Sequence, residues 1–317
     1  MSTNDSPEIS VVIPTYNRWP LLSTSALPSA LAQEQVRHEV IVVDDGSSDE
    51  TNTHLRALGE PRLRLIRHER PLGVAVARNA GIHAALGEWV AFLDDDDLWS
   101  PLKLRRQLDV LRSESASFVY SDIVVLDERR RTTYELTAPE PDDLASRLLA
   151  RYVIPGGPSN VVANSALVRR LGGFDEHLSM TADWDFWLRL ARSGKGARCP
   201  GALVATTAHA ANMPMRASWR ELVRDLDYFT EKHGSAGLSI DKAGFAHWLA
   251  LQRHRGGKTL EPAFRLLELS LRFRRPRYAL QGLALLLPRR DKPSVSVEEA
   301  AREPAWLAQF RRGDLAA

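Results

Sequence analysis

The chain has 317 residues, of which 44% are hydrophobic and 26% are charged, and it contains one cysteine, Cys199. These values are typical of a globular protein long enough for one large α/β domain and an appendage, and a single cysteine excludes a disulfide framework within the chain. The formal net charge is +2, but residues 251–317 hold 14 Lys+Arg and 7 Asp+Glu, whereas residues 1–250 hold 28 and 33. The basic tail can meet a membrane surface, a nucleic acid or an acidic partner, although a solvated helical face is the simpler interpretation.

The sequence contains no apolar run of the roughly 20 residues that a membrane-spanning helix needs. Its first residues, Met1–Glu8, are polar and lack the apolar segment of a secretory signal. Because a single cysteine also suits a reducing compartment, we expect a cytoplasmic protein, with peripheral contact at the inner face of the membrane as an extension of that expectation.

The first hundred residues alternate between short apolar runs and helical patterns. The apolar runs are 9–13, 39–43, 63–66 and 89–93, and the helical patterns cover 20–34, the residues up to Leu58, and 73–86. This alternation predicts a mainly parallel, doubly wound sheet with helices on both faces. Ligands of such sheets bind beyond the carboxyl ends of the strands. The helix over 20–34 should bend at Pro28.

Polar clusters follow three of these runs, in the loop 14–18, at Asp44 and Asp45, and at Asp94–Asp97. Four consecutive carboxylates at the end of a buried strand repel one another unless a cation or hydrogen-bond donors offset the repulsion. Oxygen ligands are those that Mg²⁺ and Mn²⁺ prefer, typically with phosphate oxygens completing the shell. The acidic run therefore predicts a divalent-metal site, and a solvated acidic turn is the alternative.

Two common nucleotide-binding motifs are absent from the sequence. No Gly-x-Gly-x-x-Gly follows the first apolar run, and no Gly-x-x-x-x-Gly-Lys-Ser/Thr occurs. These absences argue against a dinucleotide-dependent oxidoreductase and against a P-loop enzyme.

Five sequence elements resemble, in order and spacing, those of the family 2 glycosyltransferases of the GT-A fold. They are residues 11–18, 42–47, 77–81 and 92–97, and the later element formed by 172–176 and 182–189. The resemblance implies a Rossmann-like α/β catalytic domain over 1–215 and a helical C-terminal region over 216–317. It also implies an inverting transfer from a nucleotide sugar, which is non-processive because the Gln-x-x-Arg-Trp of processive polymerases is absent.

The same resemblance implies a site for the nucleotide-sugar donor at the strand ends. The residues expected there are Pro14, Thr15, Tyr16, Asn17, Arg18, Asp44, Asp45, Arg78, Asp94 and Asp95. Either Asp44 or Asp45 would accept a hydrogen bond from a uracil-like base, and Tyr16 would form a wall beside it. A plain turn at Asp44-Asp45 and a surface ion pair at Arg78 are the structural alternatives.

Asp94 and Asp96 would form the D-x-D pair of the family, with Asp96 as the ligand of Mn²⁺ or Mg²⁺. Such a metal bridges the diphosphate and stabilises the leaving nucleoside diphosphate. Asp95 is the rival ligand, because the register within four acids is ambiguous. His209 is expected as a late contact to the metal or the diphosphate, although a lone histidine is more often structural.

The resemblance places the catalytic base in the later element, where a Glu-Asp pair of the family opens a helix. Here Ala182 replaces the Glu, and Asp183 would deprotonate the acceptor hydroxyl. Asp185 is the next candidate, and a helix cap is the structural alternative for Asp183. Trp184 and Trp187 could stack on a sugar, but their helical spacing favours the core.

The loop 152–160 is expected to cover the acceptor site, or else to be an ordinary Pro- and Gly-containing turn. The acceptor would be a glycan, a lipid-linked intermediate or a secondary metabolite, and no nucleic acid partner is expected. Residues 275–290 form an apolar stretch with arginines at both ends. This stretch could lie on a membrane surface, or pack on the catalytic domain or on a second copy in a homodimer.

Two other functions remain compatible with the sequence. A sugar nucleotidyltransferase of similar fold would need a Gly- and Lys/Arg-rich phosphate loop after the first strand, and the loop 14–18 is not one. A degenerate member would bind a sugar nucleotide or carbohydrate without turnover, and the missing Glu at Ala182 is the observation that favours it.

Overall fold

The computed structural model describes residues 6–127, 132–208, 219–234, 242–255, 260–272, 274–286 and 304–312. His209, expected from the sequence as a metal contact, lies outside these residues, as do residues 287–290 of the apolar stretch with basic ends. Among the helices so described, none has the length and apolar character needed to cross a membrane.

Strand β1 (Ile9–Thr15) is the centre of a parallel half-sheet. It pairs in parallel with β2 (His38–Asp44) and β4 (Trp89–Phe92), and β3 (Leu63–Arg67) pairs in parallel with β2. The carboxyl ends of these strands therefore lie at one edge of the sheet, as the alternating sequence pattern predicts.

Helices connect these four strands. They are α1 (Trp19–Leu21), the π-helical turn η1 (Leu22–Ala26) and α2 (Leu27–Leu31) after β1, α3 (Thr51–Ala57) after β2, and α4 (Val74–Ala84) after β3. The helix expected over 20–34 is thus divided, with the π-helical turn directly before the first turn of α2, where Pro28 stands.

The second half of the sheet is mixed in direction. It contains β5 (Leu98–Trp99), β6 (Phe118–Asp127), β7 (Thr132–Leu136), β8 (Val162–Asn164) and β9 (Gly196–Ala208). Strand β8 runs antiparallel to β4 and β6, β5 runs antiparallel to β9, β7 runs antiparallel to β6, and β9 is parallel to β6. The order across the described sheet is β3-β2-β1-β4-β8-β6-β9-β5, with β7 beside β6. The expected parallel arrangement holds for β1 to β4 but not for most later pairs, because a short apolar run does not reveal the direction of its strand.

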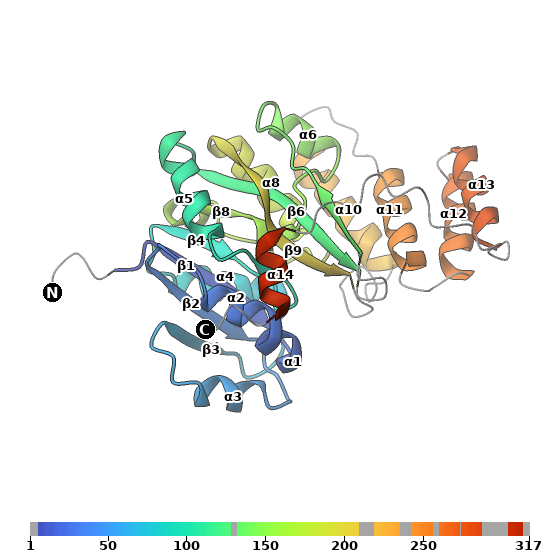
Figure 1. Cartoon of the computed structure of the whole chain (residues 1–317). Helices are drawn as coiled ribbons and strands as arrows, with labels where there is room; N and C mark the ends of the chain where they lie inside the picture. Colours follow the sequence, from blue (N-terminus) through green and yellow to red (C-terminus); the bar gives the residue numbers. More distant parts are fainter. Residues whose placement is uncertain are drawn as a thin grey trace.

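The helices of this second half are α5 (Lys103–Ser113), α6 (Leu144–Ala150), the 3₁₀ turn η2 (Gly157–Asn160), α7 (Ser165–Arg170) and α8 (Ala182–Ser193). Helices cover both faces of the sheet (Figure 1). Val11 of β1 packs in the core that α2 and α5 share, and its neighbour Val12 packs in the core of α4 and α8. On α4, a Cβ at Gly81 would lie 2.3 Å from Val12 Cγ1, so glycine allows the helix to approach β1 closely.

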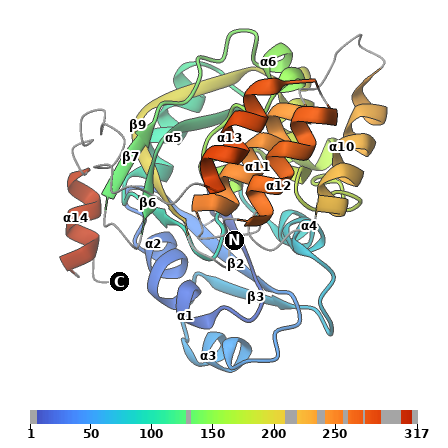
Figure 2. The ribbon, with the colours of Figure 1, turned by 90° about the vertical axis from the view of Figure 1, so that its right-hand side faces the viewer.

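The C-terminal helices are α10 (Trp219–His233), α11 (Lys242–Arg255), α12 (Leu260–Arg272), α13 (Pro276–Leu286) and α14 (Ala305–Arg312). Leu222 and Phe229 of α10 belong to the same core as Trp184 of α8. The division of the chain at residue 215 therefore stays a prediction, and one hydrophobic core crosses it. Helices α12 and α13 lie at the end of the molecule away from strands β1 to β3 (Figure 1), and Figure 2 views the protein from that end.

Helix α14 returns to the sheet. Trp306 Nε1 donates to the Ala202 carbonyl of β9 at 3.0 Å, and Leu307 packs against Leu98 of β5 and Val124 of β6. Helices α10 and α14 thus pack at different places on the catalytic half.

Candidate active site

The loops after β1, β2 and β4 meet at the carboxyl edge of the sheet. Thr15, the last residue of β1, donates from Oγ1 to Asp95 Oδ2 at 2.9 Å, and its carbonyl accepts from Asp45 N at 2.9 Å. Residues that follow β1, β2 and β4 therefore lie together at this edge of the sheet, as their positions in the sequence predict.

The loop after β1 is shaped by Asn17, which has a φ of 54°. Its side-chain oxygen accepts from Ser48 N at 2.7 Å, and its backbone N donates to Ser47 Oγ at 2.8 Å. Asn17 thus joins this loop to the one after β2. Pro14 is buried within β1, whereas the Tyr16 side chain is 44% exposed and can contact a ligand.

Asp44 and Asp45 both hold loops in place. Buried Asp44 accepts from Ser47 N at 2.9 Å and is paired with Arg67, and Asp45 accepts from Gly73 N at 2.8 Å and lies 2.7 Å from His68 Nδ1. Both residues therefore have the contacts that the structural alternative, a plain turn, predicts. Their contact with a base stays a prediction.

Arg78 of α4 borders the acidic run. Its Nη2 donates to Asp94 Oδ1 at 2.6 Å, and its guanidinium lies over the Phe174 ring, 5.1 Å from the centroid. In the described part of the chain, the buried Arg78 Nε has no hydrogen-bond partner. The guanidinium is thus buried beside the acidic run, and not on the helix surface as the structural alternative required.

Asp95 and Asp96 share one cation. Arg18 Nη1 lies 2.8 Å from Asp95 Oδ1 and 3.0 Å from Asp96 Oδ2. Burial raises the pKa of Asp95 to about 6, and the negative charge of Asp96 adds to this rise. The positive charge of Arg18 lowers the pKa, but by less than burial raises it. Arg18 alone therefore does not offset the burial and repulsion of these carboxylates.

Asp97 is buried and accepts from Ser159 Oγ at 2.5 Å. Burial, followed by the charges of Asp96 and Asp94, raises its pKa well above the ordinary value. Burial and mutual repulsion thus disfavour the ionised forms of Asp95 and Asp97 in the protein alone. Ser159, from η2, also accepts at its carbonyl from Trp99 Nε1 at 2.7 Å, which fixes the turn after the acids.

The acidic run fits a divalent cation that completes its shell with ligand oxygens. Asp94 and Asp96 are partly exposed, whereas Asp95 and Asp97 are buried, so the alternate pair faces the site. Within the described residues, no group of three or more His, Cys, Asp or Glu side chains could hold a metal ion alone. A site that relies on one or two carboxylates and a diphosphate is the usual arrangement for Mg²⁺.

Asp183 lies in the first turn of α8 and is held by Tyr152. Tyr152 OH donates to Asp183 Oδ2 at 2.8 Å, and Trp184 N donates to Oδ1 at 2.8 Å. Burial raises the pKa of Asp183, and the tyrosine hydrogen bond and the charge of Arg78 oppose that rise. The N-cap of α8 is Thr181, so Asp183 is not the cap that the structural alternative supposed.

The loop 152–160 lies beside this aspartate, and its expected place over the acceptor site stays a prediction. A Cβ at Gly157, which has a φ of +56°, would lie 3.8 Å from Asp183 Oδ2 and 3.9 Å from Tyr152 OH. The role of Tyr152 itself was not foreseen, because a tyrosine in a Pro- and Gly-containing turn carries no signal of its partner 31 residues away.

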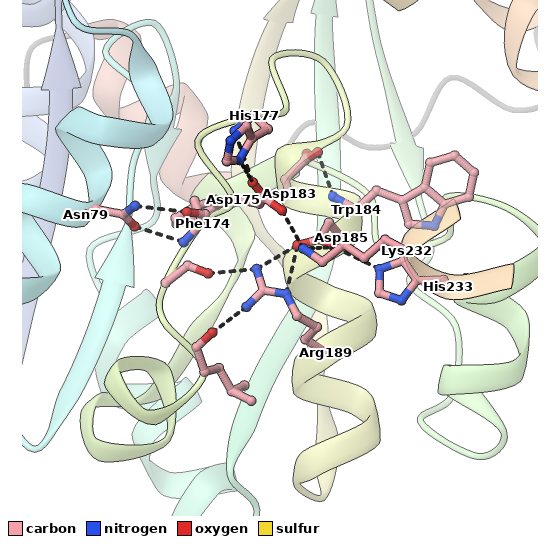
Figure 3. Close-up of polar contacts among 12 residues, drawn as sticks. Asn79, Phe174, Asp175, His177, Asp183, Trp184, Asp185, Arg189, Lys232 and His233 are labelled. Atoms are coloured by element: carbon pink, nitrogen blue, oxygen red, sulfur yellow. Dashed lines mark hydrogen bonds and ion pairs between the residues drawn. The ribbon is translucent and has the colours of Figure 1, made fainter. Parts of the chain in front are cut away.

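Asp185, the second candidate base, is a structural residue (Figure 3). It is fully buried and lies 2.7 Å from Arg189 Nη2, 2.9 Å from Lys232 Nζ and 2.8 Å from His233 Nε2. Burial alone would raise its pKa, but the His233 hydrogen bond and the positive charges hold it below the ordinary value. A carboxylate so tightly paired cannot reach an acceptor. Trp184 and Trp187 are 1% and 0% exposed, which confirms their expected place in the core.

Comparison with known proteins identifies the family. The family model described as Glycosyl transferase family 2 matches residues 10–170. The chain is 33% identical over 239 residues to the uncharacterized glycosyltransferase YwdF of Bacillus subtilis (strain 168), covering 73% of this chain and 86% of YwdF. It is 43% identical over 125 residues to the succinoglycan biosynthesis protein ExoO of Rhizobium meliloti (strain 1021), covering 39% of this chain and 36% of ExoO.

A third relative is the UDP-Glc:alpha-D-GlcNAc-diphosphoundecaprenol beta-1,3-glucosyltransferase WfgD of Escherichia coli, 34% identical over 119 residues, which are 38% of this chain and 47% of WfgD. The chain thus spans less than half the length of ExoO and of WfgD.

Solved structures share the fold. S. aureus TarS 1–349 in complex with UDP-GlcNAc has a TM-score of 0.61 at 20% identity, covering 87% of this chain and 79% of TarS 1–349. The mannosyltransferase PcManGT from Pyrobaculum calidifontis, in complex with GDP-Man and Mn²⁺, has a TM-score of 0.53 at 20% identity, covering 98% of this chain and 80% of PcManGT. The chain therefore belongs to glycosyl transferase family 2 and is a glycosyltransferase with the GT-A fold.

Proposed function

We propose that this glycosyltransferase moves a single sugar from a nucleoside-diphosphate sugar to a hydroxyl group, with inversion and with help from a divalent metal. The observation that carries the proposal is that Arg78 interacts with two carboxylates, by a hydrogen bond to Asp94 and by its charge on Asp183. Arg78 donates to Asp94 at 2.6 Å, and its charge also stabilises the ionised form of Asp183. Because both Arg78 and Asp94 act electrostatically on Asp183, we place the donor-side acids and the proposed base at one site.

In this reaction Asp183 accepts the proton of the acceptor hydroxyl while the hydroxyl oxygen forms a bond to the anomeric carbon. The bond from that carbon to the diphosphate breaks, and its electron pair leaves with the nucleoside diphosphate. Tyr152 holds Asp183 by its 2.8 Å hydrogen bond, and this donor favours the ionised carboxylate that the reaction needs. A divalent cation held by Asp96, with Asp95 as the rival ligand, would neutralise charge that develops on the diphosphate.

The donor side fits a nucleoside diphosphate. Arg78 has a buried N–H without a partner in the described part of the chain, and Tyr16 is exposed in the loop after β1. Solved complexes of two proteins with this fold contain UDP-GlcNAc in one case and GDP-Man with Mn²⁺ in the other, which supports a nucleotide-sugar donor and a divalent metal here. The residues that we expect to bind the donor are those of the loop 14–18 together with Asp44, Asp45, Arg78, Asp94 and Asp95.

For the acceptor, we favour a lipid-linked glycan over a free glycan or a secondary metabolite. The name of WfgD specifies an acceptor carried on diphosphoundecaprenol, and WfgD is 34% identical over its matched part. Such an acceptor requires the enzyme to work at a membrane surface. We therefore place the protein in the cytoplasm, in peripheral contact with the inner face of the membrane, and expect no nucleic acid partner.

The membrane contact is assigned to the hairpin of α12 and α13. Large apolar side chains are exposed along both of its helices: Leu260, Phe264, Leu271, Leu280, Leu283 and Leu286. Leu271 is 84% and Leu280 is 70% exposed, which is unusual for side chains of this size. Residues 260–286 also contain five arginines against two glutamates. Apolar side chains beside a surplus of arginines complement an anionic lipid surface better than they complement a second copy of the same basic hairpin.

The experiment that tests the reaction measures nucleoside diphosphate released from a panel of sugar nucleotides, with Mn²⁺ and with lipid-linked or soluble glycan acceptors. Acceptor-dependent release supports the transferase. Binding of a sugar nucleotide without release under every condition would favour the degenerate binding module. Release of pyrophosphate from a nucleoside triphosphate and a sugar phosphate would favour the nucleotidyltransferase.

A further inference from the structure

Helix α10 holds the segment that leads to the proposed base. This segment, residues 171–181, connects α7 to α8 and is called the α8 entry loop below. The family match ends at residue 170, so neither the loop nor α10 belongs to the matched segment. Yet four polar side chains of α10, those of Asp225, Tyr228, Lys232 and His233, bind the loop or the first turn of α8.

Lys232 joins two carboxylates from different elements (Figure 3). Its Nζ lies 2.5 Å from Asp175 Oδ2 in the α8 entry loop and 2.9 Å from Asp185 Oδ1 in α8. Hydrogen bonds and the positive charge of Lys232 hold the pKa of Asp175 below its ordinary value, against the effect of burial. Both carboxylates therefore stay ionised at neutral pH, and Lys232 connects them electrostatically.

His233 also binds Asp185, and its contacts define which ring nitrogen carries the hydrogen. Arg192 Nη1 lies 3.2 Å from His233 Nδ1, and a guanidinium can only donate, so Nδ1 accepts. The other ring nitrogen, Nε2, consequently carries the hydrogen and donates to Asp185 Oδ1 at 2.8 Å. His233 thus serves as a directional donor to a carboxylate that stands two residues after Asp183.

Asp225, one further residue of α10, fixes the end of the same loop. Its buried Oδ2 accepts from Ser179 N at 2.8 Å and from Met180 N at 2.7 Å. These two amides precede Thr181, the N-cap of α8. The path of the chain into α8, and with it the place of Asp183, is therefore set by contacts from the C-terminal region.

From these contacts we propose that Lys232 and His233 are positioning residues for the transfer reaction: they hold Asp185 and Asp175, and so the first turn of α8, at the place where Asp183 meets the acceptor. This proposal rests on the role of Asp183 given above. It assigns a part of the acceptor-side machinery to a helix outside the matched family segment.

Paired substitutions test the proposal while keeping side-chain size. Lys232→Met removes the charge and Lys232→Arg keeps it; His233→Phe removes both ring nitrogens and His233→Gln keeps a donor. Arg220→Gln, at an exposed position of the same helix, is the control for loss of one positive charge. We expect turnover to fall roughly 10- to 100-fold in Lys232→Met and His233→Phe, because a displacement of about 1 Å of a catalytic group has an effect of this size.

The conservative variants should recover most of that turnover, the Kd of the donor should stay within about twofold of the parent, and Arg220→Gln should behave as the parent. Turnover of Lys232→Met and His233→Phe that equals the control, or an equal loss of donor affinity, would overturn the proposal.

A second measurement does not depend on turnover. Amide hydrogen exchange of residues 177–184 should become faster in Lys232→Met than in Arg220→Gln, while exchange in the loop after β1 stays unchanged. Unchanged exchange in residues 177–184 would also overturn the proposal. If the parent transfers no sugar at all, the proposed function fails, and the exchange result still decides whether α10 positions the first turn of α8.

Discussion

Asn79 of α4 binds both backbone groups of Phe174 in the α8 entry loop. Its Oδ1 accepts from Phe174 N at 2.8 Å, and its Nδ2 donates to Phe174 O at 2.9 Å (Figure 3). The neighbouring residue on α4, Arg78, faces the acidic run and covers the Phe174 ring. One short stretch of helix thus connects the donor side of the site with the loop that leads to Asp183.

Replacing Asn79 should show this connection. Asn79→Asp keeps the acceptor for Phe174 N but removes the donor to Phe174 O. The buried carbonyl of Phe174 would then face a carboxylate oxygen instead of an N–H group. We expect the free energy of unfolding to fall by about 1–3 kcal/mol, and turnover to fall with it. Urea unfolding with the parent in parallel measures the first quantity. A variant as stable as the parent would show that the amide is not needed for this contact.

Metal binding is expected to depend on Asp96. Asp96→Asn should abolish transfer and remove the Mn²⁺-dependent part of donor affinity, whereas Asp95→Asn should lose mainly the contacts that Asp95 makes with Thr15 and Arg18. Calorimetric titration of donor with and without Mn²⁺ separates these effects. Full activity of Asp96→Asn, or of the parent in excess chelator, would exclude the metal role. The reverse order of the two variants would make Asp95 the ligand.

The pH dependence of transfer should reflect the environment of Asp183. Its pKa is raised by burial, with Asp94 adding to the rise, while Tyr152 and Arg78 oppose it. A base acts only when ionised, so kcat/KM should fall as the pH drops through this raised pKa, above the range of an ordinary aspartate. Tyr152→Phe removes a hydrogen bond to the ionised form, so the pKa should rise further and the acidic limb should move to higher pH.

The matched control for Tyr152→Phe is Tyr134→Phe, at an exposed tyrosine of β7. It should leave the pH profile of kcat/KM where the parent has it. If the acidic limb of Tyr152→Phe stayed in place or moved to lower pH, Asp183 would not be the group that titrates.

Association with lipid should require the α12–α13 hairpin. The parent should sediment with anionic vesicles at low salt and be partly released by added salt, because salt screens the arginines. Leu280→Glu combined with Leu283→Glu should bind several-fold less. The control pair, Leu58→Glu with Leu86→Glu, changes exposed leucines of the catalytic half and should bind as the parent does. Parent-like binding of the hairpin variant would contradict the assignment, and conversion of a dimer to a monomer by that variant would identify a second copy as the occupant.

The first half of the fold could be predicted from sequence because its signals are local. Each strand from β1 to β4 is one short run of mostly apolar residues, and polar residues stand where β1, β2 and β4 end. The mixed half of the sheet could not be predicted in this way. The directions and the neighbours of its strands β6, β8 and β9 depend on contacts between residues that are distant in the chain. The division of the helix before Pro28 by a π-helical turn likewise has no pattern that the sequence displays.

The candidate site shows the same limit. Asp94, Asp96, Arg78 and Asp183 could be chosen from motif positions, and the structure gathers them at the carboxyl edge of the sheet. The residues that bind them could not be chosen from the sequence. Tyr152 is far from Asp183 in the chain, as Lys232 is from Asp175, and tyrosine and lysine occur at many other positions. Asp185 resembled a base in sequence, and only its partners in the structure, the cations Arg189 and Lys232 and the Nε2–H donor of His233, argue against that role.

The account depends most on Asp183 as the base, and the turnover of Asp183→Asn at saturating donor and Mn²⁺ tests it most directly. General-base help contributes roughly 10²- to 10⁴-fold in rate, and the base lies on the acceptor side. We predict that the variant folds, binds the donor as the parent does, and transfers sugar more slowly by about that factor. Turnover within a few-fold of the parent would contradict the account, and so would a collapse of donor affinity together with turnover.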